Sequence, residues 1–145
     1  MNDIQIQRSL SLFAKGCNCA QAVLVAFGPE LGFSEEQCMK LAAAFGGGIA
    51  RRAELCGAVS GALMAIGLQH AKSPIENPDA KAETYELAQR FISRFTEEHG
   101  SPICEKLLGC HIGTPEGRQQ AMEANLHQTR CERFVKTAIQ LVTEL

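Results

Sequence analysis

Seven cysteines occur in this chain of 145 residues, and thiols are its most distinctive chemical groups. Thiolates bind soft metal ions and iron–sulfur clusters, and a pair of thiols can also cycle between dithiol and disulfide. Cysteine can equally serve as a small buried hydrophobic side chain. The positions of the cysteines must separate these alternatives, because a static disulfide framework is not expected in a reducing compartment.

Four cysteines fall where the sequence predicts the start of a helix. The unpaired backbone amides of a first helical turn and the positive end of the helix dipole both favour an anion. A thiol placed there is expected to have a lowered pKa, which makes it a better metal ligand and nucleophile. The four candidate site residues are Cys19, Cys56, Cys104 and Cys131.

Local signals mark three of these helix starts. An asparagine precedes the first cysteine, a Ser-Pro pair precedes the third, and a capping box surrounds the last. The signals are Asn18 before Cys19, Ser101 and Pro102 before Cys104, and Thr129 with Glu132 around Cys131. Cys56 is expected in the first turn of a helix over residues 53–70, which has no obvious capping residue.

The other three cysteines are interpreted as structural. Cys38 and Cys110 lie in apolar surroundings and are expected to be small buried side chains. Cys17 is the exception that stays open, because it stands two residues before Cys19.

The elements that must position these thiols are all predicted to be helical. Apolar residues recur at spacings of three and four, and strand-like alternation is nearly absent. The pattern predicts an all-α fold, a compact bundle of about six to seven helices in a single domain over residues 1–145. The nearly all-apolar segment 53–70 is expected to be its central helix, and a helix over 77–99 to bury Tyr85, Phe91 and Phe95.

Two glycines follow Cys56 in the stretch "LCGAVSGALM". Each costs about 1 kcal/mol of helix stability relative to alanine, so a packing reason is expected. Small residues four positions apart let another backbone approach the helix closely. We therefore predict that Gly57 and Gly61 admit a neighbouring helix that brings a second candidate cysteine toward Cys56.

Three consecutive glycines, Gly46, Gly47 and Gly48, precede Arg51 and Arg52. Backbone amides of such a turn can cradle an anion, and arginines would assist. The phosphate-loop pattern needs a lysine followed by serine or threonine, and the dinucleotide fingerprint needs a preceding strand. Neither is present, so a plain sharp turn is the favoured interpretation.

Composition excludes several classes of partner. The net charge of −2 and the pI near 6.1 provide no electrostatic footprint for nucleic acid or an anionic membrane surface. The N-terminus lacks the pattern of a secretory signal, and no apolar run reaches the roughly 18–20 residues that a membrane span needs. We expect a cytoplasmic protein with an unidentified redox partner protein, and a homo-oligomer is compatible with the sequence.

Four blocks in order, "GCNCAQAVLVAF", "FGGGIARRAELCGAVSGALMAIG", "ICEKLLG" and "CERFV", resemble the redox-active protein family named for its C_GCAxxG_C_C cysteine pattern. The resemblance implies an all-helical domain whose redox-active cysteines could hold an iron–sulfur cluster. Its cysteines fall on the four candidates Cys19, Cys56, Cys104 and Cys131. The family is similar to a domain of split-Soret-type cytochromes, but no C-x-x-C-H motif occurs here, so haem is not expected.

Three functional hypotheses stay open at the level of sequence. The four cysteines could bind an iron–sulfur cluster for electron transfer. A pair, for which Cys56 and Cys131 are the candidates, could cycle between dithiol and disulfide, which would make the protein a thiol oxidoreductase. The third hypothesis is a helical scaffold or binding module with structural cysteines or zinc, although the usual paired C-x-x-C spacing of zinc sites is missing.

Overall fold

A computed structural model describes residues 3–145, and eight α-helices account for most of that part of the chain. Short 3₁₀ turns cover Gly28–Leu31 and Ala43–Phe45, and one π-helical turn covers His127–Cys131. The α-helices are α1 (Asp3–Ala14), α2 (Cys19–Phe27), α3 (Glu35–Leu41), α4 (Gly57–His70), α5 (Ala80–His99), α6 (Cys104–Leu108), α7 (Pro115–Glu123) and α8 (Glu132–Thr143). The all-α prediction is confirmed.

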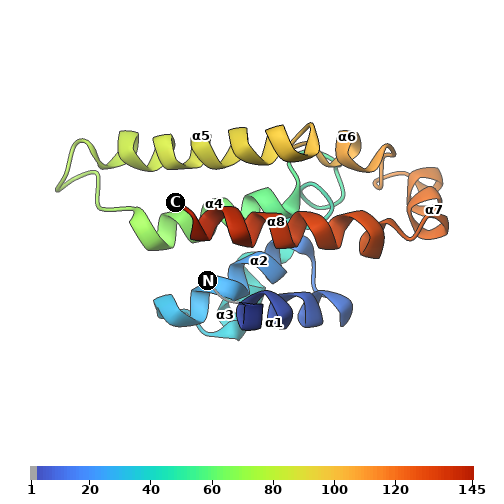
Figure 1. Ribbon diagram of the computed structural model, residues 1–145, viewed down its shortest axis with the longest axis horizontal. Helices are drawn as coiled ribbons and strands as arrows, with labels where there is room; N and C mark the ends of the chain where they lie inside the picture. The colour runs from blue at the N-terminus through green and yellow to red at the C-terminus, as the bar shows by residue number, and fades with distance from the viewer. Residues whose placement is uncertain (1–2) are drawn as a thin grey trace.

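The helices are arranged in layers around α4 and α8 (Figure 1). The long helix α5 runs along one side of this pair, and α2 packs on the other side, with α1 and α3 beyond it. Helices α6 and α7 lie together at one end of the molecule. The predicted central position of α4 is confirmed, since its side chains are buried through most of its length.

The closest approach in the bundle is between α2 and α4. A Cβ atom on Gly61 would lie 2.6 Å from the carbonyl oxygen of Ala20 and 3.0 Å from the Cβ of Val23. Gly57 is almost as tightly covered, because a Cβ atom on this residue would lie 3.0 Å from the carbonyl oxygen of Phe45. The two glycines therefore allow backbone-to-backbone packing that no larger residue would permit.

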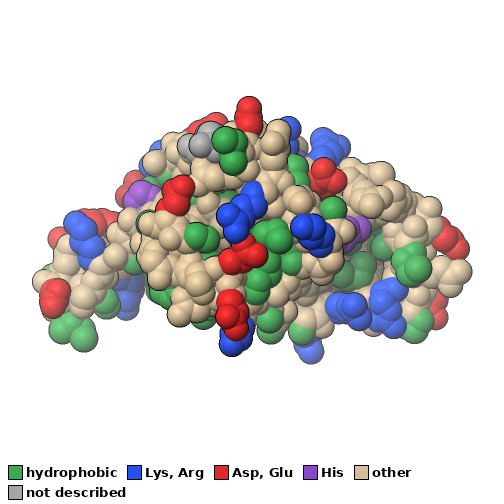
Figure 2. Space-filling model, turned by 90° about the horizontal axis from the view of Figure 1, so that it is seen from below, with side chains coloured by type: hydrophobic (Ala, Val, Ile, Leu, Met, Phe, Trp, Pro, Cys, Tyr) green, Lys and Arg blue, Asp and Glu red, His purple; other side chains and the backbone are tan. Residues whose placement is uncertain are grey.

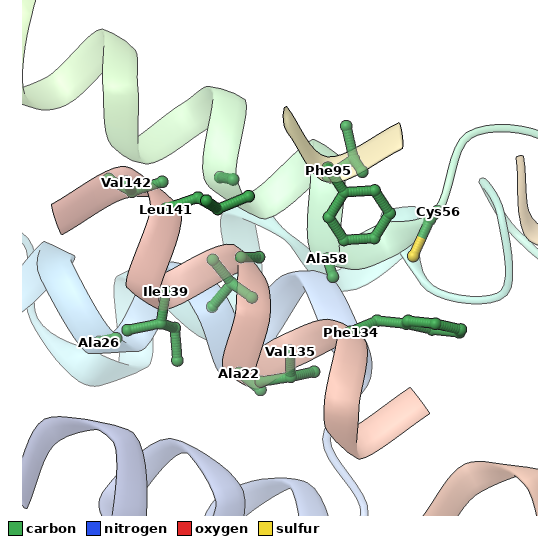
Figure 3. Packing of buried hydrophobic residues seen from close by; sticks show 14 of the residues in the cluster. Ala22, Ala26, Cys56, Ala58, Phe95, Phe134, Val135, Ile139, Leu141 and Val142 are labelled. Atoms are coloured by element: carbon green, nitrogen blue, oxygen red, sulfur yellow. The ribbon is translucent and has the colours of Figure 1, made fainter. Parts of the chain in front are cut away.

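Helix α8 closes the core with one apolar face. Val135 lies beside Ala22 and Ile139 beside Ala26, so α8 covers the side of α2 (Figure 3). The ring of Phe134 extends toward the region of Cys56, at the edge of the same core (Figure 3). The hydrophobic core thus reaches directly to a candidate thiol.

Two details of the predicted helices are wrong. The central helix begins at Gly57 and not at residue 53, because Ala53 has a left-handed backbone (φ 59°) that no right-handed helix can contain. Tyr85 is 59% exposed, whereas Phe91 and Phe95 are fully buried as expected. The first half of α5 extends along the surface, so its aromatic residue faces solvent.

Two further findings concern helix number and length. The structure has eight α-helices over residues 3–145, one more than the upper end of the predicted six to seven. None of the helices in this range combines the length and the apolar character that a membrane span requires.

Gly61 and Gly67 lie on the same helix in different surroundings, so they give a matched test of this packing. Gly61→Ala should lower the free energy of unfolding by about 1–3 kcal/mol, because the new methyl group meets the α2 backbone. A Cβ atom at position 67 would meet no atom within 4 Å, so Gly67→Ala should instead raise the free energy of unfolding by about 0.5–1 kcal/mol. Urea unfolding of both variants checks this, and equal effects would contradict the close-approach interpretation.

Candidate functional site

One cavity of about 480 Å³ gathers sulfur side chains from distant parts of the chain. All four candidates from the sequence line it, together with one cysteine that the sequence left open. The five lining cysteines are Cys17, Cys19, Cys56, Cys104 and Cys131. The structure thus brings the predicted set together, and it places Cys38 and Cys110 elsewhere, as expected.

Cys19 is positioned by the start of α2. Asn18 accepts a hydrogen bond from the amide of Gln21 (2.8 Å), and the Gln21 side chain accepts one from the amide of Asn18 (2.8 Å). This capping box confirms the predicted helix start. Asn18 also donates to the carbonyl oxygens of Ala42 and Ala43, so the cap is fastened to the turn before the three glycines.

Cys56 and Cys104 are brought side by side by a short backbone pairing. The amide of Cys56 donates to the carbonyl of Pro102 (2.8 Å), and the amide of Cys104 donates to that of Glu54 (2.6 Å). Cys104 is the first residue of α6, as predicted, whereas Cys56 occupies the N-cap position of α4, just outside its first turn. Both residues therefore stand at the start of a helix, and the backbone pairing holds these two helix starts next to each other.

Cys131 does not follow the predicted capping box. The hydroxyl of Thr129 donates to the carbonyl of Asn125 (3.0 Å), and the π-helical turn His127–Cys131 runs without interruption into α8. A π turn widens the helix by one residue and changes the direction of the side chains that follow. The wide turn, and not a helix start, accounts for the placement of Cys131.

The three-glycine segment forms the wall next to Cys104. Gly47 and Gly48 have left-handed backbones, and the same conformation continues through Ile49, Ala50 and Arg51 (φ between 51° and 69°). A Cβ atom on Gly48 would lie 2.7 Å from the Cβ of Cys104. Glycine at this position therefore lets the turn press against the thiol-bearing residue.

Burial overrides the expected effect of the helix starts on two of the four thiols, Cys56 and Cys104. Desolvation raises the pKa of Cys56 to about 11, although the amides of Ala58 and Val59 oppose it. It raises the pKa of Cys104 to about 12, helped by repulsion from the neighbouring thiolates. The prediction that all four pKa values are lowered is wrong, because removal from water costs a thiolate more than a helix N-terminus returns.

Cys19 and Cys131 behave as one coupled pair. The Cys19 thiol donates a hydrogen bond to the Cys131 sulfur, which raises the pKa of Cys19 and lowers that of Cys131. Burial of Cys131 acts against this lowering, and the charge of Arg130 supports it. In the metal-free protein the first thiolate to form is therefore that of Cys131.

The lining includes residues outside the sequence-based candidate set, among them Cys17, Phe13 and His127. Cys17 lines the cavity, and burial raises the pKa of its thiol to about 11. The rings of Phe13 and His127 stack at the cavity with centroids 3.9 Å apart. The spacing of Cys17 from Cys19 was a usable signal, whereas the stacked rings come from α1 and the π turn and share no local pattern.

The surroundings of Gly57 bear out its predicted role. A Cβ atom on this residue would lie 3.2 Å from the Cβ of Cys19 and 3.1 Å from the amide nitrogen of Ala20. Both belong to the start of α2, which carries the second cysteine toward Cys56. The clearance at Gly57 thus admits Cys19.

The sulfurs are not arranged around a single ion. Among residues 3–145, no group of three or more His, Cys, Asp or Glu side chains has the geometry to hold one metal ion. The five cysteines line part of a cavity of about 480 Å³, together with apolar side chains and the three-glycine turn.

The coupled pair predicts an order of thiol reactivity. In reduced, metal-free protein at pH 7.5, iodoacetamide should modify Cys131 first, since its pKa is the one that is lowered. Cys19→Ala removes the hydrogen-bond donor, so the alkylation of Cys131 should slow by about tenfold for each unit by which its pKa rises. Peptide mass spectrometry over time measures both rates.

Cys38→Ala is the control for this experiment, because it removes a buried thiol outside the cavity. It should leave the alkylation rate of Cys131 unchanged. A rate at Cys131 that is equally insensitive to Cys19→Ala would contradict the coupling.

Comparison with known proteins identifies the family of the chain. A family model described as "Putative redox-active protein (C_GCAxxG_C_C)" matches residues 17–145. An "Uncharacterized protein" of Archaeoglobus fulgidus is 31% identical over 125 residues, which cover 81% of this chain and 83% of the relative. No solved structure matches the chain. The chain belongs to the C_GCAxxG_C_C family of redox-active proteins.

Proposed function

We propose that this protein transfers electrons through an iron–sulfur cluster held by Cys19, Cys56, Cys104 and Cys131. The observation that carries the proposal is the convergence of these four thiols, from four separate helical elements, on one cavity. Cysteine thiolates are the standard ligands of two-iron and four-iron clusters, which supply one-electron transfer when bound.

The electrostatics of the four thiols support a cationic centre. Repulsion from Cys56, Cys104 and Cys131 contributes to the raised pKa of Cys19, and Cys104 is affected in the same way by Cys56 and Cys131. Four thiolates so close together need positive charge between them. Loading with iron would offset the repulsion and release protons, so it should weaken as the pH falls.

The cavity is large enough to hold a cluster. A cluster places several iron and sulfide atoms between its ligands, so its thiolates stand farther apart than those around one ion. The absence of a single-ion geometry over residues 3–145 is consistent with such a spacing. The apolar side chains of Phe13, Leu107 and Phe134 at the cavity would limit access of water to the bound group.

A second candidate function rests on the hydrogen bond between Cys19 and Cys131. The Cys131 thiolate would attack a disulfide of an oxidised partner protein, forming a mixed disulfide and releasing one partner thiolate. Cys19 would then displace the second partner thiolate to form the Cys19–Cys131 disulfide, so the partner gains two electrons and the one proton that Cys19 gives up. The sequence-based pair was Cys56 and Cys131, and the charge of Cys131 contributes to the raised pKa of Cys56. Cys56 and Cys104 would have no direct part in the Cys19–Cys131 reaction.

We further propose that the partner in either case is a redox protein and that the protein works in a reducing compartment such as the cytoplasm, where thiols stay free.

The test is anaerobic purification followed by an absorption spectrum and by iron and sulfide analysis. We expect visible absorption with iron and acid-labile sulfide in equal amounts, and a loss of both in Cys56→Ser and Cys104→Ser. Cys38→Ser should retain the cluster, because this thiol lies outside the cavity.

The same variants separate the two functions. A colourless protein that cycles a Cys19–Cys131 disulfide, unaffected by Cys56→Ser or Cys104→Ser, would replace the cluster proposal with the dithiol function. Tightly bound zinc without iron would overturn both redox proposals and favour a structural role.

Gly57→Leu gives an independent prediction. The side chain would push the start of α2, with Cys19, away from Cys56, since the first added atom already meets Ala20 and Cys19 at 3.1–3.2 Å. We expect most of the bound iron to be lost. Gly67→Leu, on the same helix but in open space, is the control and should retain it. Unchanged iron content in Gly57→Leu would refute the clearance role.

A further inference from the structure

The wall of the cavity next to the thiols carries an unused positive charge. Arg51 lines the cavity and makes no ion pair within residues 3–145. The next residue, Arg52, is different, because its Nε lies 3.7 Å from Glu54 and it does not line the cavity. Two adjacent arginines thus have separate environments.

Backbone amides add to this charge in a fixed direction. The carbonyl oxygens of Gly46, Gly47 and Gly48 accept hydrogen bonds from the amides of Arg51 (3.2 Å), Ala53 (3.1 Å) and Glu54 (2.9 Å). The peptide bonds are trans, so the amide that follows each carbonyl points the opposite way, out of the turn.

Those outward amides belong to Gly47, Gly48 and Ile49, and none has a hydrogen-bond acceptor in the part of the chain that the structure describes. Gly47 and Gly48 line the cavity. A succession of parallel, unpaired amides favours an anion.

The position of Arg51 is fixed by the same turn. Its Cγ would lie 2.9 Å from a Cβ atom on Gly47, so its side chain begins alongside the free amides. Its carbonyl oxygen lies against Gly113, where a Cβ atom would be only 2.4 Å away. The turn therefore fixes the backbone and the first carbons of Arg51 beside the cavity, and the exposed side chain is free to pair with a bound anion.

The rest of the lining is mainly hydrophobic, with Phe13, Leu107, Leu108, Ile112 and Phe134. On the face shown in Figure 2, hydrophobic side chains and a histidine lie in a hollow toward the end that carries α7, next to a group of Lys and Arg side chains. The volume of about 480 Å³ is within the range of small-molecule pockets. An apolar surface facing an anion-binding wall fits a ligand with both characters.

We propose that this cavity binds a small organic anion, a carboxylate with an apolar body, whose charged end meets Arg51 and the amides of Gly47 and Gly48. The apolar body would pack on the hydrophobic lining, close to the thiols. The site depends on the turn and on Arg51, and it does not require that the cysteines hold iron. It therefore stands or falls separately from the proposed electron-transfer function.

Calorimetric titration of the purified protein with four probes tests the proposal. Benzoate represents a carboxylate with an apolar body, acetate and sulfate are anions without one, and benzyl alcohol is the uncharged counterpart. We expect benzoate to bind at least about tenfold more tightly than the other three, since both the charge and the apolar surface contribute.

Arg51→Gln should weaken benzoate binding by about tenfold or more, whereas Arg52→Gln should change it less than about twofold. Ile112→Ala should weaken the binding of benzoate but not of acetate, and it keeps the proposal testable if Arg51→Gln does not fold. Iron content, measured on the same samples, reports on the electron-transfer proposal independently.

Three results would overturn the inference. The first is that benzoate does not bind. The second is an equal loss of benzoate affinity in Arg51→Gln and Arg52→Gln, which would indicate nonspecific charge attraction. The third is that sulfate binds as tightly as benzoate, which would indicate a simple oxyanion site.

Discussion

The close approach of α2 and α4 is the constraint on which the site depends. Glycine at positions 57 and 61 lets the two backbones touch, and this contact sets the start of α2 against the start of α4. Cys19 and Cys56 occupy those two starts, so their separation is fixed by main-chain packing and not by flexible side chains. The cost of glycine in a helix is offset because the close contact buries both helices on their facing sides.

The other half of the site is held by main-chain hydrogen bonds between segments distant in sequence. Pairing of residues 54–56 with 102–104 joins Cys56 to Cys104, and the left-handed turn stacks Gly48 against the latter. That turn places Ile49, a β-branched residue, at φ 69°, a conformation that costs of order 1–2 kcal/mol per residue. The bonds from Arg51, Ala53 and Glu54 to the glycine carbonyls hold it in place, so strain is concentrated beside the thiols.

The sequence predicted what local chemistry decides. The capping box of Asn18 and Gln21, the helix start at Cys104 and the clearance at Gly57 all depend on residues within a few positions of one another. The left-handed turn at Ala53 and the π turn before Cys131 were missed. Distant segments contribute to both, because the amide of Glu105 donates to the Ala53 carbonyl and Arg130 donates to the carbonyls of Leu107 and Leu108. Thiol pKa values could not be predicted either, since desolvation depends on how completely the folded core covers each sulfur.

Burial also determines which chemistry the cysteines can perform. Helix-start amides stabilise a thiolate only modestly, and the loss of water at Cys56 and Cys104 exceeds that stabilisation. Such thiols are poor nucleophiles at neutral pH, yet they become thiolates once a metal cation supplies the missing charge. Cys131 alone is poised to react without a cation, because Cys19 donates a hydrogen bond to it. Three of the four candidate thiols, Cys19, Cys56 and Cys104, thus have raised pKa values. Disulfide exchange needs only two thiols, so a set of four with this property is better suited to hold a positively charged centre.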